Sequence, residues 1–320
     1  MREAACSLMT SAICRLMSAA LVVLATCIGA PVARAGDTPP PPGYAYEDTR
    51  RLVSLVERAA QLVEQKGRDA FGAFGNQPSL WVDRDFYLFV YALDGTCLYH
   101  GAEPDLVGHN LMDMRDLSGK PVIRLITDIG RQTNPQARGW VFYLWEDGIR
   151  IEPSRKAAFV RKAISGPDGQ IYLVGSGAYA LKMERAIVQH TVQDAAQLIS
   201  EKGTAAFAEL LDAASRFALP DAYIFVMDEQ GNMVVDPAYP RLPGGRDLTK
   251  LRDATGVYVV RTVLEKLAGV EEAWVQFLLP RPGLHVPVRK AIYVRKVRTG
   301  DKIFLVGADF FLATPIWMKV

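Results

Sequence analysis

The chain has 320 residues, of which 50% are hydrophobic and 22% are charged, a globular composition that excludes disordered and fibrous proteins. The 37 basic and 35 acidic residues almost balance, so the chain lacks the strong positive charge of proteins that bind nucleic acids through their phosphates. At about 150 residues per domain, the length predicts two domains.

The first 35 residues have the features of a secretory signal peptide. Arg2 and Arg15 precede the apolar run 16–29, and residues 33–35 (Ala-Arg-Ala) form a small-residue cleavage site. The run is short for a membrane span, although an uncleaved N-terminal anchor is the alternative. We therefore expect a periplasmic or secreted protein.

Removal of residues 1–35 would change the chemistry of the chain. This segment holds three of the 37 basic and one of the 35 acidic residues, so 34 of each remain and the mature chain is neutral. It also holds three of the four cysteines, which leaves Cys97 in a predicted strand without a disulfide partner. The Pro-rich residues 36–45 predict an extended linker.

The remainder of the chain contains one pattern twice. Residues 59–67 recur as residues 195–203, an offset of 136, and later matches follow in the same order with offsets between 137 and 132. Collinear matches with small changes of offset indicate a duplicated domain with altered loop lengths. We expect one domain over residues 46–180 and a second over residues 181–320.

Both repeats predict the same elements in the same order. Apolar residues at helical spacing run through 52–63 and 188–199, and Gly67 and Gly203 follow as helix C-caps. A hairpin strand, a short helix and three further strands come next. They cover 86–93, 121–129, 140–145, 157–163 and 171–176, and in the second repeat 223–227, 257–267, 274–279, 291–297 and 303–308. This order predicts an α+β fold with an antiparallel sheet in each repeat.

Six motifs follow one another through the first repeat, at residues 94–100, 104–111, 115–121, 139–143, 155–161 and 174–179. In this order they resemble the Cache family, in particular its single-Cache type 2 members. The resemblance implies a PAS-like sheet with a long N-terminal helix against one face and a small ligand, commonly a short organic acid, on the other. It also implies a position outside the cytoplasm, where such domains serve receptors, kinases and cyclases.

The second repeat departs from these motifs. Residues 240–248 replace the Pro-Asp-Leu-Val-Gly motif loosely, and Asp309 interrupts the segment where the family has Gly-x-Gly-x-Tyr. Tyr293 keeps an aromatic hydroxyl that the first repeat loses at Phe159. The sequence therefore leaves open which repeat binds a ligand.

The candidate ligand-binding residues are cations and hydroxyls beside aromatic rings, which suit an organic acid. Lys156 and Lys290 occupy equivalent strands, and strand alternation leaves open which face of residues 155–162 lines a pocket. The solvated end of a strand is the alternative place for these lysines. The aromatic candidates are Tyr87, Tyr91, Trp140, Tyr143, Tyr179, Tyr223, Trp274 and Tyr293, although an aromatic residue in a strand more often packs in the core. Asp309 would favour an amine or a cation in the second repeat, or cap a loop.

No catalytic or cofactor motif is recognisable. His100, His109, His190 and His285 are far apart in the sequence and lack matching cysteines, so we expect no metal site. The sequence also lacks a Gly-x-Ser-x-Gly nucleophile elbow and a dinucleotide-binding glycine motif in the required context. We therefore expect neither an enzyme nor a bound cofactor, with an enzyme of unrecognised type as a remaining alternative.

These observations predict an extracytoplasmic protein that binds a small molecule, an organic acid or an amino acid. No kinase motif and no second apolar span follow the repeats, so we expect the signal to pass to a separate membrane receptor, kinase or transporter. The alternative is a structural or accessory envelope protein that uses degenerate Cache domains for protein–protein contact.

Overall fold

The computed structural model describes residues 43–82, 86–146, 153–220, 222–237, 248–280 and 286–312. The predicted signal peptide and most of the predicted linker lie outside these residues. Among the helices of the described residues, none combines the length and the apolar character needed to span a bilayer.

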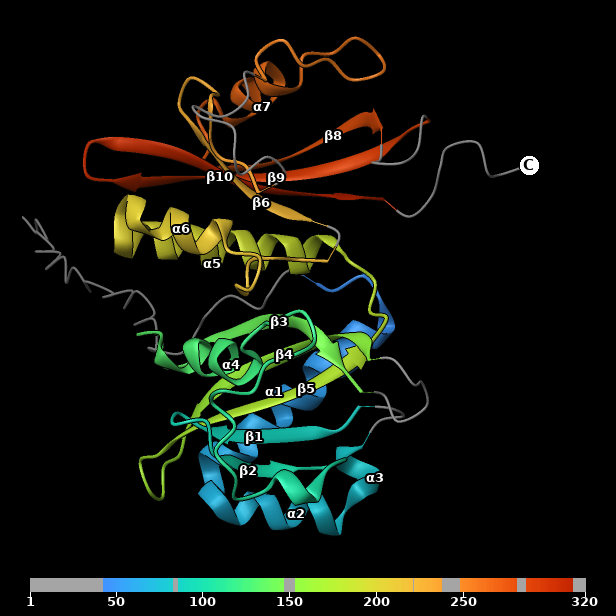
Figure 1. Ribbon diagram of the computed structural model, residues 1–320, viewed down its shortest axis with the longest axis vertical. Helices are drawn as coiled ribbons and strands as arrows, with labels where there is room; N and C mark the ends of the chain where they lie inside the picture. The colour runs from blue at the N-terminus through green and yellow to red at the C-terminus, as the bar shows by residue number, and fades with distance from the viewer. Residues whose placement is uncertain are drawn as a thin grey trace, which may run out of the picture. The chain divides into compact units, whose positions relative to one another are not determined.

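The first repeat contains a five-stranded antiparallel sheet with the strand order β2-β1-β5-β4-β3 (Figure 1). Its helices and strands are α1 (Glu47–Lys66), α2 (Ala70–Asn76), α3 (Pro78–Trp81), β1 (Leu88–Ala92), β2 (Cys97–His100), α4 (Val122–Arg131), β3 (Arg138–Trp145), β4 (Ser154–Ile164) and β5 (Ile171–Tyr179). Short 3-10 turns, η1 (Gly67–Asp69) and η2 (Pro104–Leu106), follow α1 and β2.

The second repeat has a five-stranded sheet with the equivalent order, β7-β6-β10-β9-β8. Its elements are α5 (Arg185–Lys202), η3 (Gly203–Ala205), α6 (Ala206–Leu211), β6 (Tyr223–Asp228), β7 (Met233–Val235), α7 (Val259–Leu267), β8 (Glu272–Pro280), β9 (Pro287–Thr299) and β10 (Lys302–Phe311). The predicted α+β fold with two antiparallel sheets is confirmed, and the short helices α2, α3 and α6 are additions that the sequence pattern did not predict.

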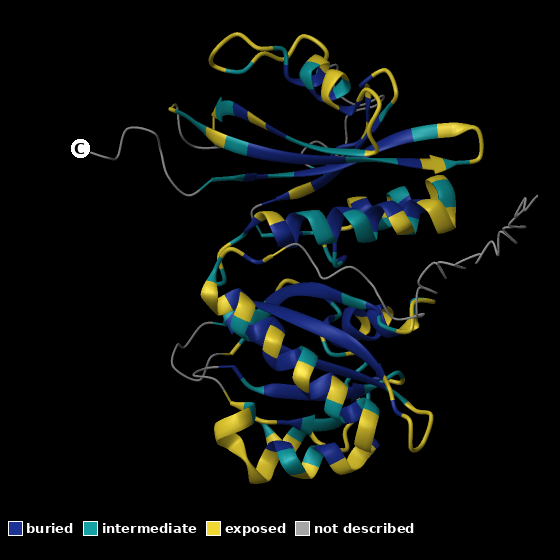
Figure 2. Cartoon of the chain, turned by 180° about the vertical axis from the view of Figure 1, so that it is seen from behind, coloured by how far each residue is buried: buried dark blue, intermediate teal, exposed yellow. Residues whose placement is uncertain are grey.

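Helix α1 forms because its apolar residues recur every three to four positions and make one continuous stripe. Leu52, Val56, Ala59 and Val63 from this stripe are fully buried, and the helix packs on β4 and β5. Figure 2 shows buried and exposed residues alternating along the helix, whereas the strands of the sheet are mostly buried. The helix ends at Gly67, whose φ of 57° is unfavourable for residues with a side chain.

The two faces of the first sheet pack against different elements. Leu88, Val90 and Trp140 belong to the cluster beneath α1. Phe89, Tyr91 and other residues of opposite parity pack instead with Ile123, Ile126 and Ile129 of α4. The sheet is therefore covered on both sides, and each strand residue is assigned to a face by its place in the alternation.

Candidate functional site

Lys156 is a buried cation on the α4 face of the first sheet. It lies in β4, and only 2% of its surface is exposed. Its ammonium nitrogen lies 4.0 Å from the ring centroid of Tyr87, 5.3 Å from that of Tyr179 and 5.9 Å from that of Trp145. It also hydrogen-bonds to the Tyr87 hydroxyl. Rings at these distances stabilise a positive charge through their negative faces.

Two glycines of β5 make room for this arrangement. A Cβ atom placed on Gly177 would lie 2.6 Å from Cε of Lys156, and one placed on Gly175 would lie 2.4 Å from the ring of Phe89. Both distances are shorter than any normal contact. The Gly-Ser-Gly segment of β5 therefore allows a long cationic side chain and an aromatic ring to lie across the sheet.

His100 completes one side of the site. It is opposite Phe89 in the β1–β2 hairpin, is 4% exposed, and its ring centroid lies 5.1 Å from that of Tyr87. Its Nδ1 accepts a hydrogen bond of 2.9 Å from the backbone N–H of Glu103. Burial and the nearby charge of Lys156 lower the pKa of His100 to about 4. The imidazole is consequently neutral at pH 7.

Among the described residues, Glu103 is the carboxylate that attracts the charge of Lys156. Burial lowers the pKa of Lys156 to about 7, and the Coulomb attraction of Glu103 opposes this shift. Oε1 of Glu103 is already bonded, because it accepts a hydrogen bond of 2.9 Å from Nε1 of Trp145. Within the described part of the chain, no carboxylate lies within ion-pair distance of Lys156.

Two further tyrosines lie on the same face of the sheet. Tyr91 and Tyr143 are 2% and 7% exposed, and burial raises the pKa of both hydroxyls. They are therefore neutral and can act as hydrogen-bond donors. With the Lys156 ammonium and the Tyr87 hydroxyl, they form a set of donors surrounded by aromatic rings, an environment that suits a small anion.

A cavity of about 590 Å³ lies beside Tyr143 and Lys156, which are the two members of this donor set in its wall; residues 213 and 218–220, which follow α6, line it as well. Lys120 also lines it, and its Nζ donates hydrogen bonds of 3.0 Å to the carbonyl of Phe142 and 2.9 Å to that of Ala218. Burial lowers the pKa of Lys120. A space of this volume is sufficient for a small organic molecule.

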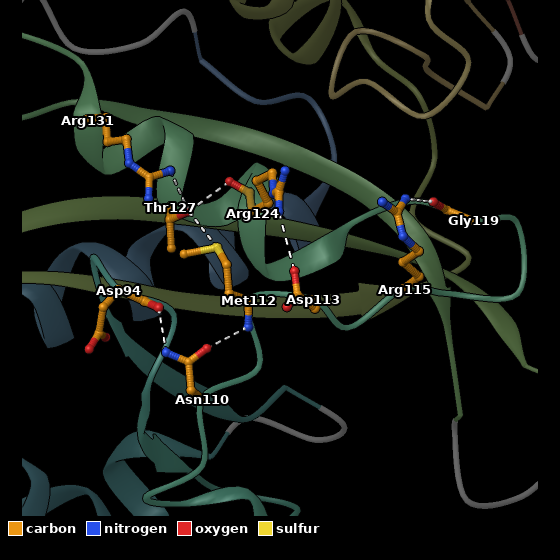
Figure 3. Close-up of polar contacts among 9 residues, drawn as sticks. All are labelled: Asp94, Asn110, Met112, Asp113, Arg115, Gly119, Arg124, Thr127 and Arg131. Atoms are coloured by element: carbon orange, nitrogen blue, oxygen red, sulfur yellow. Dashed lines mark hydrogen bonds and ion pairs between the residues drawn. The ribbon is translucent and has the colours of Figure 1, made fainter.

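The segment between β2 and α4 covers this face and is held by local hydrogen bonds (Figure 3). Nδ2 of Asn110 donates to the carbonyl of Asp94 at 2.7 Å, and its Oδ1 accepts from the N–H of Met112 at 3.1 Å. Asp116 accepts bonds from three backbone N–H groups, including that of Leu144 in β3. Residues of the motifs at 104–111 and 115–121 therefore hold the segment that covers the site in place.

Three aromatic candidates lie on the other faces of their sheets. The ring of Trp140 is 6.0 Å from that of Tyr44 and 5.2 Å from that of Phe159, in the cluster beneath α1. The ring centroids of Trp274 and Tyr293 lie 5.0 Å apart, with the rings tilted by 38°, in the corresponding place of the second repeat. Trp140 is three positions before Tyr143, and Trp274 is three positions before Phe277. An odd spacing in a strand places two side chains on opposite faces, so neither tryptophan shares a face with the residue three positions after it.

The remaining candidates of the second repeat are arranged differently from their counterparts. Lys290 forms an ion pair of 2.8 Å with Asp309, and Tyr223 is 51% exposed. The structure therefore brings together Tyr87, Tyr91, Tyr143, Lys156 and Tyr179, all from the first repeat.

Sequence reasoning missed His100, Glu103, Trp145 and Gly177 as members of this site. His100 was considered only as a metal ligand. Its contact with Tyr87 depends on the register of the β1–β2 hairpin, which is shifted between Val90 and Tyr91. The turn at Asp94-Gly95 predicts the β1–β2 hairpin, and the pairing of these strands could have placed His100 beside the tyrosines. The register shift depends on a bulge that the turn residues do not predict.

Two regions, residues 54–165 and 173–310, match the family model described as Single Cache domain 2. The chain belongs to this Cache family. The predicted resemblance and the duplication are thus confirmed. Cache domains are extracytoplasmic domains that sense small molecules, and they typically bind their ligands without converting them.

Several solved structures are similar to one repeat of this Cache protein. A periplasmic sensor domain of a chemotaxis protein is 27% identical and covers 43% of this chain and 100% of its own, with a TM-score of 0.32. A methyl-accepting chemotaxis protein from Vibrio parahaemolyticus is 19% identical, with coverages of 41% and 88% and a TM-score of 0.31. A Cache chemosensory domain studied for carboxylic acid recognition is 19% identical, with coverages of 42% and 94% and a TM-score of 0.30. No match was found among curated proteins.

Proposed function

We propose that the first repeat binds a small organic acid outside the cytoplasm through Lys156. The observation that carries this proposal is the burial of Lys156 in a group of aromatic rings, with no ion-pair partner among the described residues. An ammonium group in such a place is costly unless an anion joins it. A ligand carboxylate would supply that anion.

The neighbouring groups support a carboxylate over a neutral ligand. The hydroxyls of Tyr87, Tyr91 and Tyr143 are neutral, and each can donate a hydrogen bond to a carboxylate oxygen. His100 is neutral as well, so it adds no second positive charge. The rings of Trp145 and Tyr179 would exclude water and strengthen the ion pair.

Ligand occupancy would be reported to a separate membrane receptor, kinase or transporter. The bound acid would favour one packing of the sheet and its covering segment, and this population shift would be the signal. Helix α5 begins at Arg185, six residues after β5 ends at Tyr179, and it packs on β9 and β10 of the second sheet. It is therefore the element through which a change in the first repeat would reach the second.

Thermal unfolding of the protein lacking residues 1–35 tests the proposal, with acetate, propionate, lactate, pyruvate and amino acids as the panel. We expect at least one carboxylate to raise the melting temperature, and Lys156→Met to remove this effect. Lys162→Met is the matched control, because Lys162 lies in the same strand and is also buried, but donates to the carbonyl of Gln132. No shift with any acid, or equal loss in both variants, would contradict the proposal.

A role in protein–protein contact is the second candidate, and the second repeat favours it. At the positions of Tyr91, Tyr143 and Tyr179, the second repeat has Met227, Phe277 and Phe311, as the matching strand registers show. Capture of the same envelope protein by the wild type and by Lys156→Met, with and without carboxylates, would support this role. Capture that depends on a carboxylate would instead support sensing.

A further inference from the structure

The ion pair between Lys290 and Asp309 lies where the first repeat has a lysine and a glycine. In the first sheet, Lys156 is opposite Tyr179 and Ala158 is opposite Gly177. In the second sheet, Lys290 is opposite Phe311 and Ile292 is opposite Asp309. The two registers are the same, so Asp309 occupies the position of Gly177.

The geometry shows what this replacement does to the second lysine. Oδ2 of Asp309 lies 2.8 Å from Nζ of Lys290, and their side chains are 17% and 19% exposed. Nζ of Lys290 is also 4.9 Å from the ring centroid of Phe311, as Nζ of Lys156 is 5.3 Å from that of Tyr179. The two ammonium groups therefore have the same place relative to their sheets, and among the described residues only the second has a carboxylate within ion-pair distance.

A carboxylate attached to the neighbouring strand competes strongly with a dissolved one. Asp309 is held within bonding distance of Lys290 by the β9–β10 pairing, so its effective concentration is far above that of a free acid. An incoming carboxylate would have to displace Asp309 or lie beside it. Displacement breaks a partly buried ion pair, and a second carboxylate adds like-charge repulsion.

The surroundings of Asp309 disfavour an anion further. Asp236 is the equivalent of His100 in the second repeat, at an offset of 136 residues. Burial and the negative charge of Asp236 both raise the pKa of Asp309. Attraction and a hydrogen bond from Lys290 oppose this shift. Phe277 and Phe311 also lack the hydroxyls that Tyr143 and Tyr179 provide in the first repeat.

We infer that Asp309 is a built-in counter-ion that takes the place of a ligand carboxylate and closes the second repeat to organic acids. This inference rests on the proposed function of the first repeat. Aspartate in place of glycine at this position then prevents the second repeat from accepting an acid, and each chain binds one acid.

Isothermal titration with acetate, propionate, lactate and pyruvate tests the inference. We expect one equivalent of acid per wild-type chain, no effect of Lys290→Met on affinity, and a second equivalent in Asp309→Gly. The double variant Lys156→Met/Asp309→Gly isolates the second repeat, and we expect it to bind an acid that Lys156→Met alone does not bind. Two equivalents in the wild type, or no binding by the double variant, would overturn the inference.

The reciprocal change tests the same inference in the first repeat. We expect Gly177→Asp to weaken acid binding at least tenfold more than Gly177→Asn, which is of similar size but uncharged. Equal losses in these two variants would show that bulk rather than charge is responsible, and would overturn the inference. Binding of ethanolamine or putrescine that Asp309→Asn abolishes would also overturn it, because Asp309 would then bind a ligand.

The outcomes separate this inference from the proposed function. If no acid binds to the first repeat of the wild type, the proposed function fails, while the double variant still reports on the second repeat. If the first repeat binds an acid and the double variant does not, the inference about Asp309 fails alone. The melting temperature of each variant shows whether it is folded.

Discussion

Replacing Lys156 by methionine should stabilise the ligand-free protein at neutral pH. Burial lowers the pKa of Lys156 from 10.5 to about 7, because the charged form has lost its hydration. A pKa difference of one corresponds to about 1.4 kcal/mol, so the protonated lysine costs the folded state roughly 5 kcal/mol at most. The bond to Tyr87 and the aromatic contacts offset part of this cost. We expect a net gain of about 2 kcal/mol in Lys156→Met.

The pH dependence identifies the origin of this gain. The pKa of Lys156 is lower in the folded state than in the unfolded state, so folding releases a proton between about pH 7 and pH 10.5. The wild type should therefore gain stability relative to the variant as the pH rises through this window. From pH 7 to pH 9, the advantage of Lys156→Met should shrink by about 2 kcal/mol.

Urea unfolding of both proteins at pH 7, 8 and 9 measures this difference. Lys162→Met is the matched control, and we expect it to be destabilised because the carbonyl of Gln132 loses its donor. For a chain of this size, 1 kcal/mol shifts the melting temperature by roughly 2–4 °C, so thermal unfolding would also detect the effect. A loss of stability in Lys156→Met at pH 7, similar to that of the control, would refute the reasoning.

Three further predictions concern the first repeat. A bound carboxylate should raise the pKa of Lys156 above about 7, so binding at higher pH is coupled to the uptake of a proton. The dissociation constant of the acid should therefore rise up to tenfold per pH unit above pH 7. Titration calorimetry in several buffers would measure both the affinity and the proton uptake. A constant affinity from pH 7 to pH 9 would contradict this. Gly175→Ala should cost about 1–3 kcal/mol in denaturant unfolding, because its Cβ would lie 2.4 Å from the ring of Phe89, and an unchanged midpoint would contradict that contact. Cys97 is buried, and burial raises the pKa of its thiol to about 11, so iodoacetamide should label it only in denaturant; rapid labelling of the native protein would show otherwise.

The main elements of the fold were predictable because their signals are local. The stripe of α1 and its terminal Gly67 are visible in the sequence, and the same pattern returns in α5 and Gly203. The helix predicted over 121–129 is observed as Val122–Arg131. Strand β5 was predictable too, since it is a run of apolar and small residues that follows a Gly-Pro-Asp-Gly turn.

The composition of the candidate site was only partly predictable. Lys156, Tyr87 and Tyr143 were identified by residue type, but alternation is symmetric and does not tell which face of a strand is covered by which helix. Packing of α1 on one face removed that ambiguity and assigned Trp140 to the core. His100 was missed because the irregular hairpin register brings it to Tyr87.

The sequence by itself determined the duplication, the order of the elements and the family, because repeats and motifs are properties of a single stretch of chain. Only the tertiary structure decided how the two lysines differ. Lys156 and Lys290 have the same neighbours in sequence, an arginine before and an alanine after. β-Strand pairing places Gly177 beside Lys156 and Asp309 beside Lys290, so only the positive charge of Lys290 is paired with an adjacent carboxylate. Burial increases the energetic effect of this difference, because charges interact more strongly away from water.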